Sequence, residues 1–143
     1  MKRTLLTLTL AASLVPAVAL ACDGADGQQQ AKGPVKATVE QVASWTKAKQ
    51  AIPVDANGSE TRSKQGVIPG AVLLTSSSQY DLKELPANKD AKLVFYCANQ
   101  KCSASEGAAQ RAIDNGYTNV AVLPVGISGW KQAGQPTAKP NNT

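Results

Sequence analysis

Runs of apolar residues separated by polar stretches divide residues 35–134 into alternating strands and helices. The near-continuous apolar run at residues 92–96 predicts a strand covered on both faces, as in a parallel sheet. Further strands are predicted at residues 50–54, 71–74 and 120–123. This spacing leaves room for a helix or a long loop between successive strands.

The helical segments are predicted from capping residues and from apolar positions three or four residues apart. Thr38 and Gln41 form a capping box at the start of a helix over residues 38–49. Ser103 or Ser105 can cap a second helix that Gly116 ends. A polar loop or short helix is expected at residues 57–65, a helical turn at residues 82–85 and a last helix at residues 127–133. Strands that alternate with helices predict an α/β sandwich with a small, mainly parallel sheet and ligands at the carboxyl ends of the strands.

Length and composition limit the chain to one such domain. The 143 residues, 43% of them hydrophobic, can bury a single core. The chain contains no His, which excludes Ser-His-Asp and Cys-His catalysis and His-ligated zinc or haem. Any chemistry must therefore come from Cys, Asp, Glu, Lys or backbone amides.

Residues 1–21 have the pattern of a secretory signal peptide. Lys2 and Arg3 precede an apolar run, and small residues stand before Cys22. The run is too short and too polar for the alternative of a single membrane span. The segment predicts export to the periplasm or cell envelope.

Cys22 is the predicted site of lipidation, because a Cys after such a segment resembles the lipobox of bacterial lipoproteins. Residues 22–34 would then be the anchor and a flexible tether, and residues 135–143 a flexible tail. Cleavage by ordinary signal peptidase, giving a soluble secreted protein, is the alternative. Membrane contact is expected only through this anchor.

Charge argues against nucleic-acid binding. Without Lys2 and Arg3, 13 basic side chains stand against 10 acidic ones, so the net charge is +3. This charge is small and scattered along the chain, unlike the basic patches of nucleic-acid-binding proteins.

The candidate chemistry lies in the loop that follows the strand at residues 92–96. Cys97 stands where the buried strand stops and a helix is about to start. Backbone amides in such a loop, together with the helix dipole, stabilise an anion and lower the pKa of a thiol. Lys101 can add to this field.

From about residue 37 to residue 136 the sequence resembles the rhodanese family. A series of landmarks in family order carries the resemblance: the helix at residues 38–49, the strand ending at Asp55, Gly66-Val67-Ile68-Pro69-Gly70-Ala71, the strand, Cys loop and helix at residues 94–111, Gly116-Tyr117, and Gly126-Ile127-Ser128-Gly129-Trp130. The resemblance implies a rhodanese-like three-layer sandwich over residues 35–134.

The resemblance also implies a sulfurtransferase activity. Rhodanese-like domains carry a reactive Cys as the first residue of a six-residue loop, which corresponds here to residues 97–102. Cys97 would take sulfane sulfur from a small donor such as thiosulfate as a persulfide, and pass it to a thiol or another acceptor. Asp55 would act as a supporting catalytic residue, and the donor would be bound by Ala98, Asn99, Gln100, Lys101 and Cys102.

This chain departs from the family at positions around the site. Ala98 and Cys102 stand where many active members have Arg, and Gln100 where they have Gly. Asn57 replaces an Arg, and Arg62 replaces an acidic residue. These departures indicate that the chain keeps the family's fold but has different side chains around the substrate.

Cys102 adds a second possible chemistry. A thiol five residues from Cys97 in one tight loop can attack a persulfide or sulfenic acid there and close a disulfide. The alternatives left open are a non-catalytic redox sensor or interaction domain with a Cys97–Cys102 disulfide, a structural disulfide, and a thiol-disulfide oxidoreductase, although CxxxxC differs from the CxxC of thioredoxin-like proteins. No cofactor or metal site is expected, because neither a second Cys pair nor a His completes a tetrahedral site.

Overall fold

The computed structural model describes residues 33–140, and the predicted signal peptide, Cys22 and most of the tether lie outside them. Five parallel strands form one sheet in the order β1-β5-β4-β2-β3. The central strands are β2 (Ile52–Asp55), β4 (Leu93–Tyr96) and β5 (Val120–Leu123), and the edges are β1 (Val35–Lys36) and β3 (Val72–Leu73). The α/β class and the parallel sheet are confirmed.

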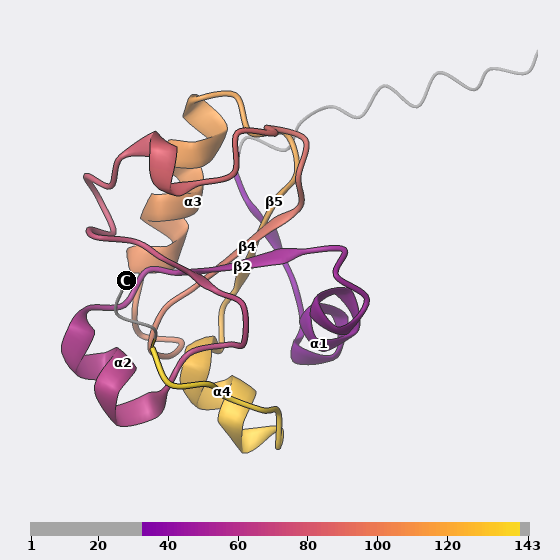
Figure 1. Ribbon diagram of the computed structural model, residues 1–143, viewed down its shortest axis with the longest axis vertical. Helices are drawn as coiled ribbons and strands as arrows, with labels where there is room; N and C mark the ends of the chain where they lie inside the picture. The colour runs from indigo at the N-terminus through magenta and orange to yellow at the C-terminus, as the bar shows by residue number, and fades with distance from the viewer. Residues whose placement is uncertain (1–32, 141–143) are drawn as a thin grey trace, which may run out of the picture.

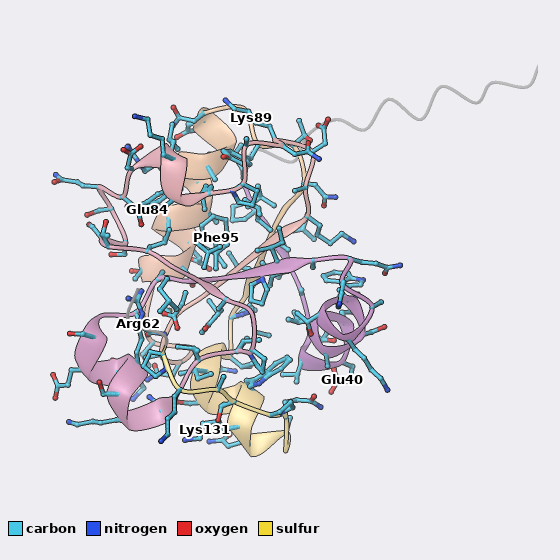
Figure 2. All side chains as sticks on the ribbon, viewed as in Figure 1. Glu40, Arg62, Glu84, Lys89, Phe95 and Lys131 are labelled. Carbon is cyan, nitrogen blue, oxygen red and sulfur yellow. The ribbon has the colours of Figure 1, made fainter. Side chains whose placement is uncertain are left out.

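Helices cover both faces of this sheet, so the molecule has three layers (Figure 1). Leu93 and Phe95 of β4 pack toward α3 (Ala104–Asp114), and Figure 2 shows Phe95 beside this helix. Val94 and Tyr96 face the other way, toward α1 (Val39–Lys47) and α4 (Gly126–Gln132). Because both faces are covered, β4 and β5 are apolar at every position.

The remaining segments are short. α2 (Ser59–Gln65) is the short helix expected after β2, and the 3₁₀ turn η1 (Leu82–Glu84) is the expected turn before β4. β1 was not predicted, because two exposed residues carry no periodic pattern. No helix among residues 33–140 is long and apolar enough to span a membrane.

The helix ends follow local chemistry with two differences from prediction. The capping box of α1 is present, with the Gln41 N–H donating to Thr38 Oγ1 at 3.3 Å. α1 ends before residue 49, because Lys49 adopts a left-handed conformation with φ of 56°. Neither serine caps α3: Ser103 occupies the N-cap position without a side-chain hydrogen bond, and the hydroxyl of Ser105 is used elsewhere.

The chain after α4 packs back onto the domain. Trp130 Nε1 donates to the carbonyl of Pro136 at 2.7 Å. Val67 and Ala138 then pair as an antiparallel bridge, with N···O distances of 3.0 and 2.8 Å. Residues 135–140 of the predicted flexible tail therefore lie against the domain in this structure (Figure 1).

Candidate active site at the carboxyl end of the sheet

The site is a loop that leaves β4 at the carboxyl end of the sheet and enters α3. Tyr96 is the last residue of β4, and Ala104 is the first residue of α3. The intervening segment holds both thiols, Cys97 and Cys102, and neither forms a disulfide. The loop therefore stands where parallel sheets place their ligands.

α4 holds one side of this loop. The N–H groups of Ile127 and Ser128 donate to the carbonyls of Cys97 and Ala98 at 2.9 and 3.0 Å. Gly126, with φ of 60°, allows this approach, since a Cβ there would come within 2.5 Å of the Cys97 carbonyl oxygen. The first turn of α4 thereby fixes the direction of two peptide units in the loop.

Asn99 holds the other half of the loop. Its side-chain oxygen accepts the Lys101 N–H at 2.9 Å, and its carbonyl accepts the Cys102 N–H at 3.0 Å. These two amides were expected to bind the donor anion together with those of Ala98, Asn99 and Gln100. In the structure both N–H groups are hydrogen-bonded to Asn99, and donor binding by these five residues stays a prediction.

The environment of Cys97 differs from the prediction. Its side chain is buried, with 1% of its surface exposed. Its sulfur lies 2.9 Å from the carbonyl oxygen of Cys102 and accepts a hydrogen bond from Ser105 Oγ at 3.3 Å. Burial raises the pKa of Cys97, the neighbouring Cys102 thiol raises it further, and the hydroxyl and N–H of Ser105 offset only part of the shift. The prediction that loop amides lower the pKa of Cys97 was wrong, because burial dominates.

Cys102 shows the opposite shift. The residue is partly exposed. Burial acts to raise its pKa, but the neighbouring Cys97 thiol and the N–H groups of Ala104 and Ala98 outweigh burial, so the pKa of Cys102 falls below its ordinary value. Of the loop amides that were expected to act on Cys97, that of Ala98 acts on Cys102 instead.

Asp55 lies at the same edge of the sheet but contacts neither thiol through its hydrogen bonds. Its Oδ1 accepts the Asn57 N–H at 2.7 Å and lies 3.3 Å from Arg62 Nε. Arg62 also donates to the carbonyls of Asp55 and Leu74 at 2.9 and 2.8 Å. The carboxylate and Arg62 therefore hold the ends of β2 and β3 together, and the supporting catalytic role of Asp55 stays a prediction.

Two contributors to the site were missed from the sequence. Arg62 was noted only as a departure from the family, although a buried Asp at a strand end signals a nearby cation. Ser105 was considered only as a helix cap, although its position in the first turn of α3 directs its buried hydroxyl toward Cys97. No sequence signal distinguished the second role.

A hollow of about 410 Å³ lies beside the loop. Three of the predicted donor-binding residues, Asn99, Gln100 and Lys101, line it together with residues of α4, and neither thiol does. Among the residues that the structure describes, no cluster of three or more His, Cys, Asp or Glu could hold a metal ion.

Comparisons with solved structures place this fold among sulfur-transfer proteins and others. A thiosulfate sulfurtransferase from Pseudomonas aeruginosa is 23% identical, with a TM-score of 0.62 over 76% of this chain and 21% of that chain. A 3-mercaptopyruvate sulfotransferase from Escherichia coli is 19% identical, with a TM-score of 0.60 over 75% of this chain and 51% of that chain.

A protein of unknown function from Rhodopseudomonas palustris, described as a possible tyrosine phosphatase, is 24% identical, with a TM-score of 0.61 over 73% of this chain and 85% of that chain. Identities this low establish the shared fold alone. No curated protein matches the chain.

A match to a family model shows to which protein family the chain belongs. The model of the rhodanese-like domain matches residues 38–133, which span α1 to the end of α4 and include the whole thiol loop. The sheet order, the covered faces and the loop at the carboxyl end of β4 agree with this match. The chain therefore belongs to the rhodanese-like domain family.

Proposed function

We propose that this domain transfers sulfane sulfur through its thiol loop, with Cys97 as the persulfide carrier and Cys102 as the resolving thiol. The observation that supports this proposal is the placement of two free thiols next to each other in the loop between β4 and α3. The fold and family are those of sulfurtransferase domains. Thiosulfate represents the donor class, and a small thiol represents the acceptor class.

The chemistry needs only the donor, the loop thiols and an acceptor. A thiolate of the loop attacks the sulfane sulfur of thiosulfate, forms a new S–S bond and releases sulfite with the electron pair of the broken bond. An acceptor thiolate then attacks the outer sulfur of the Cys97 persulfide and leaves Cys97 as a thiolate. In the absence of an acceptor, the Cys102 thiolate attacks the inner sulfur, closes the Cys97–Cys102 disulfide and releases hydrosulfide.

The test uses reduced protein, thiosulfate and mass spectrometry. Transfer predicts a gain of about 32 Da, the mass of one sulfur atom, that disappears on reduction. Trypsin separates the thiols, because Lys101 stands between them, giving peptides 93–101 and 102–111. With persulfides trapped by alkylation, the added sulfur is expected on peptide 93–101 at completion. If Cys102 has already resolved the persulfide, the expected product is instead the Cys97–Cys102 disulfide, with sulfite and hydrosulfide released. A reduced wild-type protein that neither gains mass nor releases sulfite would contradict the proposal.

A second candidate function is a redox sensor that closes a Cys97–Cys102 disulfide. The burial of Cys97 favours it, because a buried thiol is protected from most donors. Its signature is a reversible disulfide without sulfur uptake and with a reduction potential above about −300 mV, since inert structural disulfides lie lower. A mass loss on mild oxidation, without any gain from thiosulfate, would favour this function.

We also propose that the domain is exported and held at the cell envelope by a lipid on Cys22, which lies outside the described residues. The supporting pattern is the basic and apolar segment that precedes this Cys. Metabolic labelling with a fatty acid is expected to mark the wild-type protein and not Cys22→Ala. Labelling of neither protein, with cleavage before residue 22, would favour the soluble secreted form.

A further inference from the structure

The two thiols of the loop lie in opposite electrostatic surroundings. The Cys97 sulfur faces the carbonyl oxygen of Cys102 at 2.9 Å, and the negative end of that dipole disfavours a thiolate there. The side chain is also 1% exposed, which removes the water that would stabilise a charge. Both features favour the neutral form of the Cys97 thiol, and the hydroxyl of Ser105, which donates to this sulfur at 3.3 Å, offsets them only in part.

The peptide groups around Cys102 are turned the other way. Since the carbonyls of Cys97 and Ala98 point to α4, the N–H groups in the same planar trans peptide units, those of Ala98 and Asn99, point away from α4. The N–H of Ala104 lies in the first turn of α3 and has no partner within that helix. The amides of Ala98 and Ala104 both act to lower the pKa of Cys102.

Cys102 is also the thiol that a donor can reach. It is partly exposed, whereas Cys97 lies beneath the loop. The neighbouring Lys101 is exposed and attracts an anionic donor. Solvent access and the nearby positive charge therefore both favour Cys102 as the thiol that meets the donor.

We infer that Cys102 is the thiolate that first attacks the sulfur donor, and that Cys97 receives the sulfur from it. This inference rests on the proposed function and assigns the order of the two thiols within it. Cys102 is then an entry nucleophile as well as the resolving thiol, and Cys97 is the inner carrier. The opposite pKa shifts of the two thiols support this order.

Sulfur moves from the donor to Cys102 and then to Cys97 in two displacement steps. The Cys102 thiolate attacks the sulfane sulfur of thiosulfate, and sulfite leaves with the bonding electrons, so that Cys102 becomes a persulfide anion. Cys97 then attacks the outer sulfur: its proton passes to the Cys102 sulfur as the first S–S bond breaks and the second forms. The products are a Cys97 persulfide anion and a Cys102 thiol, so no external oxidant or reductant is consumed.

Single-turnover sulfur uptake tests this order. In Cys97→Ser the gain of about 32 Da is expected at close to the wild-type rate, with the sulfur on peptide 102–111. In Cys102→Ser, uptake is expected to be slower by about tenfold or more, because only the buried thiol remains. Wild-type rates in Cys102→Ser together with loss of uptake in Cys97→Ser would overturn the order and leave the proposed function intact.

Alkylation of the wild-type protein tests the order without sulfur chemistry. Reduced protein is treated briefly with iodoacetamide, digested, and the two peptides compared. Peptide 102–111 is expected to react about tenfold faster or more, and the ratio should approach one in urea. Equal rates in the folded protein, or a faster reaction at Cys97, would overturn the inference.

The pH profile of alkylation gives a further readout. A thiol reacts as its thiolate, so the rate rises with pH through the pKa of that thiol. The midpoint for Cys102 is expected below 9.0, and that for Cys97 above 9.0. If thiosulfate neither adds sulfur to the wild-type protein nor releases sulfite, the proposed function fails, while these alkylation rates still decide which thiol is the nucleophile.

Discussion

The ends of β2 and β4 are neighbours in the sheet, but they serve different purposes. Asp55 pairs in register with Tyr96, so Asp55 and Cys97 leave the sheet at almost the same level. Asp55 is fully buried and its charge is matched by Arg62. The thiols beyond β4 have no such ion pair and are surrounded by peptide groups and the Ser105 hydroxyl.

At this edge of the sheet, the end of β2 therefore carries a stabilising ion pair, and the end of β4 carries the candidate reactive thiols. A counter-charge next to a buried carboxylate offsets the water that burial removes, so the pair serves stability. Peptide dipoles shift thiol pKa values by smaller amounts and in either direction, depending on which end of the dipole faces the sulfur. The β4 end therefore holds two thiols whose pKa values are shifted in opposite directions.

The largest expected effect comes from removing the cation at the β2 end. Arg62→Ala leaves Asp55 buried without its partner and releases two carbonyl hydrogen bonds. We expect a loss of about 3–5 kcal/mol in the free energy of unfolding, measured by urea denaturation. The alkylation ratio of the two thiols should stay unchanged while the protein is folded, because Arg62 contacts neither.

Lys64→Ala is the matched control on the same helix. Its exposed pair with Glu60 spans one turn of α2, and such pairs contribute about 0.3–0.5 kcal/mol. Similar losses for Arg62→Ala and Lys64→Ala would show that the buried ion pair does not stabilise the β2 end.

The next effect tests how α4 holds the thiol loop. Gly126→Ala places a Cβ within 2.5 Å of the Cys97 carbonyl oxygen and requires a left-handed Ala. We expect a loss of about 1–3 kcal/mol, as for overpacking, and a smaller difference between the two thiols in alkylation because the loop peptides shift. Gly107→Ala in α3 meets no atom within 4 Å and should instead stabilise the domain by about 0.5–1 kcal/mol. A full alkylation difference retained in Gly126→Ala would mean that α4 does not orient the loop.

Ser105→Ala removes the hydroxyl that donates to Cys97. We expect a loss of about 0.5–1.5 kcal/mol in stability, the usual value for one hydrogen bond. Because that hydroxyl lowers the pKa of Cys97, its removal should move the alkylation midpoint of Cys97 to higher pH. The midpoint of Cys102 serves as the internal control, and a shift of Cys102 alone would contradict the assignment of Ser105.

Lys101→Glu is expected to have the smallest effect, confined to the rate of donor capture. Lys101 is exposed, so the substitution should leave stability nearly unchanged. Thiosulfate uptake should slow by about twofold to tenfold at low salt, and the difference should shrink as salt is added. Lys83→Glu on η1 makes the same charge change away from the loop. An equal slowing in both variants would assign the effect to net charge rather than to Lys101.

Much of the fold could be predicted from local pattern. β4 and β5 are unbroken apolar runs, α1 starts at a capping box, and Gly116 ends α3 with a positive φ of 90°. These features depend on side chains within a few residues of each other. β1 escaped prediction because its pairing with β5 comes from a strand more than 80 residues away.

The candidate site was only partly predictable for the same reason. Cys97, Cys102 and their loop follow from a Cys at the end of an apolar run, and Asp55 from a strand end. The contact between Arg62 and Asp55 needs α2 to fold back over β2 and β3. The contact between Ser105 and Cys97 needs α3 to begin at the right rotation.

The amino-acid sequence by itself determined that two thiols, five residues apart, share one loop between a buried strand and a helix. The tertiary structure alone decided how the peptide groups of this loop are directed relative to the two thiols. The physical reason is that a peptide unit points its N–H and its C=O in opposite directions, and the N–H groups of Ile127 and Ser128 hold the carbonyls of Cys97 and Ala98 toward α4. Residues about thirty positions downstream thus set the electrostatics of the loop.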